Sequence, residues 1–478
     1  MKILFATSEC YPFLKTGGLA DVAYALPKEM IKLGEDTRVI MPNYGSIPDK
    51  YRDKMEHLFD TTVKVGWRDQ YLGVKFLEFE GVKYYFIDNM YYFFREAPYG
   101  YFDDGERFSF FAQAVLEVLT RINFVPDVLH CNDWHTAAIP VLLKTKYLWE
   151  KEFENIKTVM TIHNLRFQGI YPPEVLGNLL GIGNELLQDF AFEFYGDVNY
   201  LKGGVNYADL VTTVSPTYAE EIKTEYFGEG LHGVMQKVDY KLKGIINGID
   251  YTMYNPKIDP HIPFKFSSVN LEEKVKNKTA LQKELGLEVR EDVPMFGIIS
   301  RLTDQKGFDI IAEAIEEFVH QDVQLVVLGT GERRYEDMFR YFQHKYPGKI
   351  SANISYNGEL AQKIYAATDF FLMPSLFEPC GLSQMMALRY GSVPIVRETG
   401  GLKDTIIPYN KYTGEGIGFT FSNYDSYDMM QAIYRALDAY QNKKEFKKII
   451  TQGMETDYSW KASAKTYQEL FQDILQKE

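Results

Sequence analysis

The chain has 478 residues, of which 46% are hydrophobic and 25% are charged, and its formal net charge is −14. At ~100–200 residues per domain, this predicts a globular protein with more than one domain. The acidic balance argues against nucleic acid and anionic membranes as partners, because both would repel it.

The cysteines also limit the function classes. Cys10, Cys131 and Cys380 form no C-x-x-C pair, which argues against a zinc site and against a disulfide framework. The N-terminus has too short an apolar run for a signal peptide, and no run reaches the ~18 apolar residues of a membrane span. We therefore expect a cytoplasmic protein.

In the first half, short apolar runs alternate with helical patterns, which is typical of a parallel sheet covered on both faces. A strand at 2–8 leads through a Gly-rich loop into a helix at 19–33, which stops at Gly34. Runs at 74–79 and 82–87 predict a β-hairpin. The other expected elements are strands at 37–41, 127–131, 157–163, 209–215 and 243–246, and helices at 106–121, 134–148 and 216–225.

Residues 251–270 are rich in Pro and lack periodicity, so we interpret them as a linker. The alternation then restarts, which predicts a second doubly wound α/β domain. Its expected strands are 295–299, 324–328, 349–355, 370–373 and 393–396, and its expected helices are 307–318, 332–346, 360–367, 382–390, 424–440 and 443–452. A further helix at 460–476 ends the chain. Ligands bind such sheets beyond the carboxyl ends of the strands. The pattern alone leaves open two independent domains with separate functions.

Two basic, Gly-containing loops each follow the first strand of a half. One runs from Lys15 to Val22 and contains Gly17-Gly18, and the other runs from Ser300 to Gly307 and contains Arg301 and Lys306. Paired glycines let a backbone approach a ligand closely, and Arg and Lys supply positive charge, so the loops favour a diphosphate. The alternative is a tight turn with solvated lysines.

Two further turns lie between a strand and a helix. In Phe377–Leu382, Glu378 supplies a carboxylate, while Gly381 and Leu382 present N–H groups to an anion. The second turn is Thr399-Gly400-Gly401-Leu402. A helix cap for Glu378 and a simple turn for the glycines are the alternatives.

Polar clusters follow two strands of the first half, at Asn132–His135 and at Thr161–Asn164. His, Asn and Asp at strand ends suit hydrogen bonds to sugar hydroxyls. A histidine with a purely structural role is equally consistent with the pattern.

Taken together, the motifs resemble bacterial glycogen synthase and plant starch synthase, family 5 of the retaining glycosyltransferases. The resemblance covers nearly the whole chain in the expected order. It rests on 15–22, 133–135, 163–164, 214–218, 247–250, 301–307 and 378–382.

The resemblance implies the GT-B fold, an α/β architecture of two Rossmann-like doubly wound domains facing across a deep cleft. The implied domains are 1–247 on the acceptor-glucan side, 248–457 for the nucleotide sugar, and a helix at 458–478 that crosses back to the first domain. The implied reaction is glucose transfer from ADP-glucose to the non-reducing end of an α-1,4-glucan, such as glycogen or a maltooligosaccharide, with retention of configuration.

The resemblance also implies roles for individual residues. Catalysis falls to Lys15, His163, Arg301, Lys306 and Glu378. Donor binding falls to Lys15, Gly18, Asp21, Asn164, Asn247, Arg301, Lys306, Tyr356, Cys380, Gly381, Leu382, Thr399, Gly400 and Gly401, with Tyr356 stacking on adenine. The acceptor side includes Glu9, Tyr99, Asp133 and His135.

One position departs from related GT-B enzymes, which carry a second glutamate eight residues after the first. Here that position is Met386, so the ribose contacts stay unassigned.

A nucleotide diphosphate is a good leaving group. It needs nearby positive charge to stabilise the negative charge that grows on its bridging oxygen, and the basic residues supply it. We therefore expect no cofactor and no metal. The alternatives are a GT-B enzyme that uses a UDP-sugar and an inactive glucan-binding homologue. A glucan phosphorylase would need a much longer chain.

Overall fold

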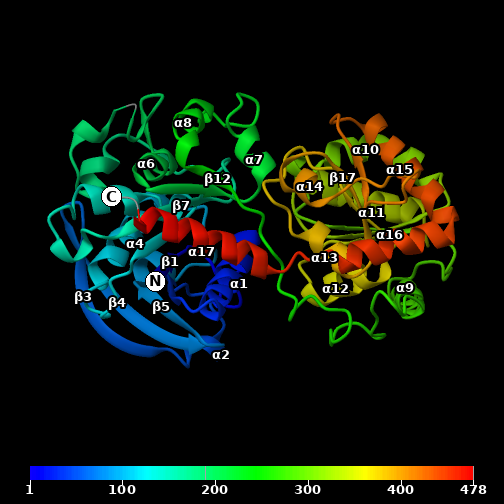
Figure 1. Cartoon of the computed structure of the whole chain (residues 1–478), viewed down its shortest axis with the longest axis horizontal. Coiled ribbons are helices and arrows are strands. Elements are labelled where there is room, and N and C mark those ends of the chain that lie inside the picture. Colours follow the sequence, from blue (N-terminus) through cyan, green and yellow to red (C-terminus); the bar gives the residue numbers. More distant parts are fainter. Residues whose placement is uncertain (189, 477–478) are drawn as a thin grey trace. The chain divides into compact units, whose positions relative to one another are not determined.

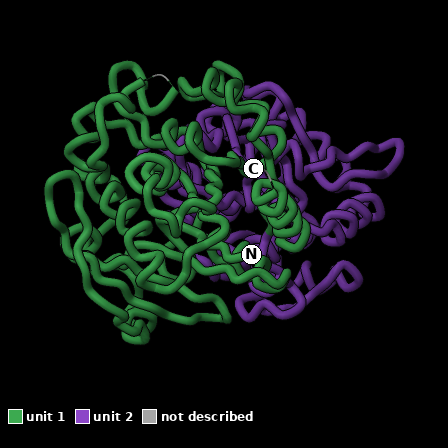
Figure 2. Tube along the Cα trace, turned by 60° about the vertical axis from the view of Figure 1, so that its left-hand side comes forward, with its two compact units in different colours: residues 1–248, 460–478 green, residues 249–459 purple. Residues whose placement is uncertain are grey.

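The structure of the protein is a computed structural model, and residues 1–188 and 190–476 are described. The chain divides into two units, which Figure 2 colours separately. Unit 1 is Met1–Gly248 with Trp460–Glu478, and unit 2 is Ile249–Ser459. The limits predicted for the domains lie one residue away at the first division and two residues away at the second.

Unit 1 is built on one large sheet, which runs in the order β12-β11-β7-β6-β1-β2-β5-β4-β3 (Figure 1). Its strands are β1 (Lys2–Ala6), β2 (Asp36–Pro42), β3 (Glu56–Val65), β4 (Arg68–Phe79), β5 (Val82–Asp88), β6 (Val128–Asn132), β7 (Lys157–Ile162), β11 (Leu210–Thr213) and β12 (Leu242–Gly244). Pairing is parallel from β12 to β5, and β4 joins β5 as the predicted antiparallel hairpin.

The helices of unit 1 are α1 (Gly18–Lys32), α2 (Asp49–Arg52), α3 (Met90–Phe93), α4 (Asp104–Val118), α5 (Ala138–Lys144), α6 (Tyr200–Tyr207), α7 (Pro216–Glu221), α8 (His232–Lys237) and α17 (Trp460–Gln476). A small sheet of β8 (Ile170–Tyr171), β10 (Asp197–Asn199) and β9 (Glu193–Phe194) lies beyond β7 in sequence. The prediction of one helix at 134–148 is wrong in extent. A 3₁₀ turn at Trp134–Thr136 precedes α5, and the helix ends at Lys144.

Helix α17 comes from the end of the chain and packs in unit 1 beside α1. Its buried residues, Trp460, Ala464, Tyr467, Phe471 and Ile474, recur at helical spacing. Ser463 Oγ donates to Ile246 O at 2.5 Å, and Gln468 Nε2 donates to Glu35 Oε1 at 2.5 Å. Apolar burial and side-chain hydrogen bonds therefore attach this helix to the unit.

Unit 2 contains a parallel sheet in the order β15-β14-β13-β16-β17-β18. Its strands are β13 (Met295–Ile299), β14 (Gln324–Leu328), β15 (Ile350–Asn353), β16 (Phe370–Met373), β17 (Val393–Arg397) and β18 (Phe419–Phe421). Its helices are α9 (Glu272–Glu284), α10 (Phe308–Val319), α11 (Arg333–Lys345), α12 (Gly358–Ala367), α13 (Ser383–Arg389), α14 (Gly400–Thr405), α15 (Ser426–Gln441) and α16 (Lys443–Glu455). In the part of the chain that the structure describes, 251–270 contains no helix or strand.

Both sheets have a point where the strand order reverses, and ligands bind doubly wound sheets there. In unit 1 the chain leaves β1 toward β2 and later returns to β6 on the other side of β1. In unit 2, β13 lies between β14 and β16 in the same way. We call this point the switch point of each sheet. A site is therefore expected in the loops after β1, β6, β13 and β16.

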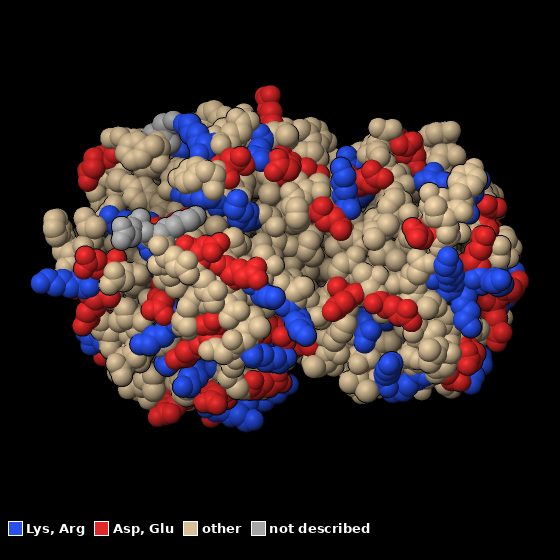
Figure 3. Space-filling model, viewed as in Figure 1, with Lys and Arg blue, Asp and Glu red and all other residues tan. Residues whose placement is uncertain are grey.

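The surface agrees with the composition. On the face drawn in Figure 3, acidic and basic side chains are interspersed over each unit and do not gather into one charged patch. No helix within the described residues is both long and apolar enough to cross a membrane.

Candidate functional site

The Gly-rich loop after β1 leads directly into α1. Gly17 is the N-cap of that helix and has no side chain to cap it. Glu9 supplies the cap from the same loop, because its carboxylate accepts from Ala20 N at 3.2 Å, Thr16 N at 2.9 Å and Thr16 Oγ1 at 2.5 Å. Burial raises the pKa of Glu9, which is 2% exposed. Both carboxylate oxygens of Glu9 thus hold this loop, and an acceptor-side role for Glu9 stays a prediction.

Lys15 and Asp21 are joined in an ion pair, with 2.7 Å between Lys15 Nζ and Asp21 Oδ1. Burial raises the pKa of Asp21, and the charge of Lys15 opposes that shift. The sequence predicts the lysine for the diphosphate and the aspartate for glucose. The structure brings them together, so an entering phosphate would compete with Asp21 for the ammonium group.

His163 follows β7 and is fixed by two residues from the end of β6. The backbone N–H of His163 donates to Asp133 Oδ1 at 2.7 Å, and the ring Nε2 lies 2.8 Å from Asn132 Oδ1. The Asn132 amide nitrogen donates to Ala6 O and His130 O, so its oxygen faces the imidazole. His163 therefore carries its proton on Nε2 and keeps Nδ1 as an acceptor. Burial lowers the pKa of His163 to about 3, so the ring is neutral at pH 7.

Asp133 has the left-handed backbone conformation, with φ of 55°. Burial raises the pKa of its carboxyl group to about 7, although the N–H groups of His163 and Asn164 counteract the shift. The structure therefore places a carboxyl group that changes charge near neutral pH beside a neutral histidine.

His135 packs among aromatic rings and not in an open loop. Its ring centroid lies 4.6 Å from that of Tyr99 and 4.6 Å from that of Phe108. Burial lowers its pKa to about 3, and its Nδ1 has no hydrogen-bond partner within the described residues. Tyr99 continues the cluster, because its hydroxyl donates to Ser8 Oγ at 2.8 Å.

Asn164 and Asn247 differ in how their amides are used. Asn164 Oδ1 accepts from Arg166 N at 3.1 Å, which forms a local turn. Asn247 is 4% exposed, and its Oδ1 has no partner in the described part of the chain. A buried amide oxygen without a donor is costly unless a ligand supplies one, which suits the predicted contact with a sugar hydroxyl.

In unit 2, Lys306 and Glu378 form an ion pair across the switch point. Lys306 Nζ lies 2.9 Å from Glu378 Oε1 and 2.6 Å from Oε2, and Ser375 Oγ donates to Oε2 at 3.0 Å. Lys306 comes from the loop after β13, and the other two residues come from the loop after β16. The Glu378 side chain is only 7% exposed. A helix cap, the alternative for Glu378, is not what these contacts describe.

The two Gly-rich turns of unit 2 pack tightly on each other. Gly401 N donates to Glu378 O at 3.1 Å. A Cβ atom at Gly400, where φ is 45°, would lie 1.9 Å from Glu378 O, and one at Gly401 would lie 2.0 Å from Cys380 O. Both glycines are thus required for this close approach, which fixes the backbone of Glu378.

The remaining residues predicted to bind the donor lie at or just before the first residue of a helix. Thr399 is the N-cap residue of α14, and Leu382 is that of α13. Gly381 has φ of 70°, and its carbonyl accepts from Gln384 Nε2 at 3.0 Å, as does that of Cys380. Gly18 is the first residue of α1. Gly18, Leu382 and Gly400 therefore lie at the starts of helices, where backbone N–H groups lack helical partners, whereas the N–H groups of Thr399 and Gly401 already donate to Arg397 O and Glu378 O.

Arg301 and Tyr356 are exposed. Among the described residues, the Arg301 side chain makes no hydrogen bond or ion pair, which leaves its charge open to an anion. Tyr356 is 80% exposed and follows β15, the edge strand of the sheet. The structure thus does not bring Tyr356 into contact with the Lys306–Glu378 pair.

Met386 lies inside α13 and is 6% exposed, so its apolar side chain is part of the core and offers a ribose no polar contact. Sequence reasoning missed Ser375, which holds Glu378, and the capping role of Glu9. A serine two residues after a strand is a weak signal, and the Glu9 contact depends on the folded loop. Within the described residues, no cluster of His, Cys, Asp and Glu could hold a metal ion.

The fold comparison gives the class of protein. The catalytic domain of starch synthase IV from Arabidopsis thaliana, bound to ADP and acarbose, matches with a TM-score of 0.93 at 33% identity and covers 100% of this chain and 99% of its own. A sucrose-phosphate synthase from Thermosynechococcus elongatus matches with a TM-score of 0.63 at 15% identity and covers 99% and 98% of the two chains, which supports the fold alone. The protein has the fold of the GT-B glycosyltransferases.

The sequence comparisons narrow that class. Residues 2–237 match the starch synthase catalytic domain, and residues 293–439 match the glycosyl transferases of group 1. The glycogen synthase of Clostridium novyi is 55% identical over 478 residues, with 100% of both chains covered. That of Caldicellulosiruptor saccharolyticus is 52% identical over 476 residues, with 99% of this chain and 100% of the relative covered. The chain belongs to the glycogen synthase family.

Proposed function

We propose that the protein transfers glucose from ADP-glucose to the non-reducing end of an α-1,4-glucan, with retention of configuration. The observation that carries the proposal is the Lys306–Glu378–Ser375 cluster at the switch point of unit 2. The names of the full-length relatives support the reaction, and the ADP and acarbose bound to the starch synthase support the substrates.

Phosphate binding would rest on three cations, Lys15, Arg301 and Lys306. An ammonium group has three N–H donors. Because Lys306 donates two of these hydrogen bonds to Glu378, one N–H donor is left for a phosphate oxygen. The growing charge on the leaving diphosphate would be stabilised by groups already held in place. We propose that these cations suffice and that no metal or other cofactor is needed.

The donor glucose would lie among uncharged hydrogen-bond acceptors and the carboxylates of Glu378 and Asp21. Nδ1 of His163 is an acceptor for a sugar hydroxyl, and the Asn247 amide oxygen needs a donor. We propose that Glu378 supports positive charge on the sugar. Because Lys306 and Ser375 both donate to its carboxylate, Glu378 is a weak nucleophile, which favours attack by the acceptor from the face that the diphosphate leaves.

The other predicted residues complete the proposal. Asp21 and Asn164 would contact the donor glucose, and Tyr356 would stack on adenine. The backbone at Gly18, at Cys380–Leu382 and at Thr399–Gly401 would line the phosphates. The acceptor side would include Glu9, Tyr99, Asp133 and His135. Cys10, Cys131 and Cys380 form no disulfide with one another within the described residues, which supports a cytoplasmic location.

The proposal is tested by incubating maltoheptaose with ADP-glucose and separating the products by length. We expect glucans lengthened by single glucose units, which β-amylase then shortens from the non-reducing end. Release of ADP with free glucose, and no lengthened glucan, would contradict transfer to an acceptor.

A further inference from the structure

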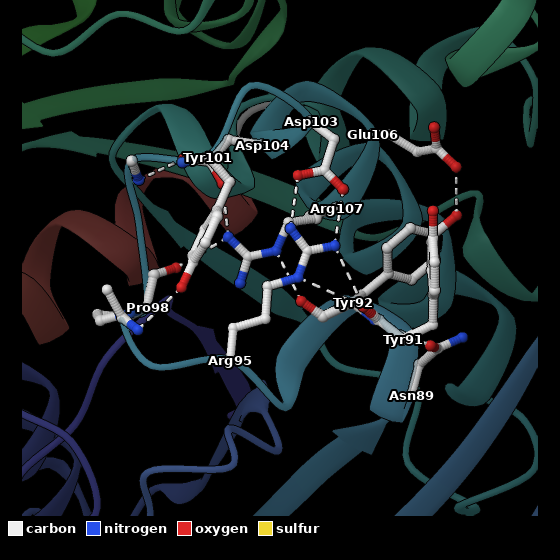
Figure 4. Close-up of polar contacts among 12 residues, drawn as sticks. Asn89, Tyr91, Tyr92, Arg95, Pro98, Tyr101, Asp103, Asp104, Glu106 and Arg107 are labelled. Atoms are coloured by element: carbon white, nitrogen blue, oxygen red, sulfur yellow. Dashed lines mark hydrogen bonds and ion pairs between the residues drawn. The ribbon is translucent and has the colours of Figure 1, made fainter.

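A fully buried arginine lies in unit 1, outside the set of residues assigned so far. Arg107 is in the first turn of α4 and has no exposed surface. Its Nε donates to Tyr92 O at 2.7 Å, and its Nη1 donates to Pro98 O at 3.0 Å and to Asp104 Oδ1 at 2.5 Å (Figure 4). One guanidinium group therefore ties the helix to two separate backbone carbonyls of the segment before it.

Asp104 adds further contacts to those of Arg107, and we call the two residues together the clamp. While its Oδ1 faces Arg107, its Oδ2 accepts from Gly100 N at 2.8 Å and from Tyr101 N at 3.2 Å. The Tyr101 ring also lies over the guanidinium group, 5.1 Å from ring centroid to Cζ. The loop at 94–103 is thus held at Pro98, Gly100 and Tyr101. These contacts lie on both sides of the single residue between Pro98 and Gly100.

That residue is Tyr99. Its hydroxyl donates to Ser8 Oγ in the loop after β1, and its ring packs against His135 after β6, with 4.6 Å between centroids. Ser8 precedes Glu9, which caps the Gly-rich loop. The side chain of Tyr99 therefore reaches the switch point of unit 1 from a loop that Arg107 and Asp104 hold in place.

A second ion pair closes the same loop nearer the surface. Arg95 donates to both oxygens of Asp103, at 2.6 Å and 2.7 Å, which ties the two ends of the loop together. Arg95 is partly exposed, whereas Arg107 is buried, so the two pairs can be loosened separately. Lysine cannot replace either arginine, because a point charge cannot reach partners that the planar guanidinium fork contacts at once.

We infer that Arg107 and Asp104 are positioning residues, which set Tyr99 at the acceptor side of the site. This inference rests on the proposed function. It assigns to them an effect on glucan binding through Tyr99, and little effect on the nucleotide sugar, because the hydrogen bonds of Glu9 that hold the loop of Lys15 do not involve Tyr99.

The test compares Arg107→Lys with wild type, using ADP-glucose and maltohexaose. We expect the KM for maltohexaose to rise about tenfold, while the KM for ADP-glucose changes less than about twofold. The matched control is Lys144→Gln, which breaks another ion pair of unit 1, 2.6 Å long, and should leave both KM values unchanged. A folded Arg107→Lys protein with an unchanged KM for maltohexaose would overturn the inference.

Repeating the change in a Tyr99→Ala background separates positioning from a general loss of stability. If Arg107 acts through Tyr99, Arg107→Lys should cost less than about twofold in kcat/KM there, although it costs about tenfold in wild type. Equal losses in both backgrounds would overturn the inference. If Arg107→Lys does not fold, Arg95→Gln carries the same comparison, with a smaller loss expected in wild type and none in the Tyr99→Ala background.

Limited trypsin digestion reads the loop without any assay of activity. Loosening the clamp should speed cleavage after Arg95 in Arg107→Lys, and cleavage as slow as in wild type would contradict the clamp. If wild type transfers no glucose, the proposed function fails, whereas this digestion still tests how the loop is held.

Discussion

The two switch points share a topology but differ in electrostatic character. In unit 1, His163 and His135 are held neutral by burial, and burial also raises the pKa of Asp133 to about 7. In unit 2, Lys306 and Glu378 form a close ion pair, and Arg301 is unpaired within the described residues. Neutral donors and acceptors suit sugar hydroxyls, while fixed charges suit a diphosphate and the charge that develops when it leaves.

Lys15 is the exception in unit 1, because it brings a cation into an otherwise largely neutral site. The difference between the units therefore teaches that one strand order can build two kinds of site. The loop residues decide which kind, and the sheet only determines where they meet.

The largest effect is expected for Lys306→Ala, which removes a cation next to a buried carboxylate. Removing a buried charge partner typically costs ~3–5 kcal/mol, so kcat/KM for ADP-glucose should fall by about two to three orders of magnitude. Lys363→Ala is the matched control, since Lys363 also pairs with both oxygens of a glutamate, at 2.8 Å and 3.0 Å, elsewhere in unit 2. Equal effects of the two changes would remove the special role of Lys306.

Glu378→Gln keeps the shape of the side chain and removes its charge. If Glu378 supports charge on the sugar in the transition state, kcat should fall by about two to three orders of magnitude with the donor KM little changed. Asp259→Asn, which alters a buried carboxylate bound to Tyr390, serves as control. A folded Glu378→Gln protein that kept more than about a third of wild-type kcat would show that the carboxylate is structural.

Acid should destabilise unit 1 through its buried histidines. Burial lowers the pKa of His130 to about 3, and its Nε2 lies 2.7 Å from Thr161 Oγ1. The pKa of a histidine in the unfolded chain is about 6.5. Below that pH the unfolded chain binds a proton at His130, whereas the folded chain does not. The free energy of unfolding should therefore fall as the pH drops from about 6.5 toward 3, with His130 contributing roughly 2 kcal/mol of this loss at pH 5.

Denaturation of wild type and His130→Gln at pH 7 and pH 5 measures that contribution. The variant should be less stable at pH 7 but should lose less stability on acidification. His344→Gln, at an exposed position of unit 2, is the matched substitution. Identical losses in wild type and in His130→Gln would contradict the assignment.

A smaller effect is expected for Glu9→Gln. Glutamine has one acceptor oxygen where the carboxylate has two, so the loop should lose a hydrogen bond to Thr16 or to Ala20. This should weaken kcat/KM for ADP-glucose by about tenfold, mainly through KM, because the loop carries Lys15. Glu35→Gln, at a buried glutamate beside the N-terminus, should not change this KM. An unchanged KM for ADP-glucose in Glu9→Gln would show that the hydrogen bonds of Glu9 do not shape the Gly-rich loop that carries Lys15.

The elements that sequence patterns predicted best are apolar and sharply bounded. The strands Gln324–Leu328 and Phe370–Met373 and the helix Trp460–Gln476 have the predicted limits. Helix α9 was missed because its buried positions include Lys274 and Lys278, so no apolar stripe marks it. Lys274 Nζ donates to three backbone carbonyls, which only the folded chain can show.

Strand β3 was missed for a related reason. Most of its residues are exposed, and only Val63 and Val65 are buried, so it lacks the alternation that marks a strand. Position along the chain also limits what a motif can tell about a site. Lys306 and Glu378 were both predicted as site residues, but their pairing joins positions 72 apart and depends on the reversal of strand order.

The chain is an ADP-glucose-dependent glucosyltransferase, and we propose that its phosphate site works without metal. The most direct test is the initial rate of nucleotide release in EDTA, with glycogen as acceptor and with ADP-glucose or UDP-glucose as donor. We expect ADP release that EDTA does not reduce, and much slower release of UDP. Turnover of UDP-glucose equal to or faster than that of ADP-glucose would contradict the donor assignment, and loss of activity in EDTA that Mg²⁺ restores would contradict the phosphate site.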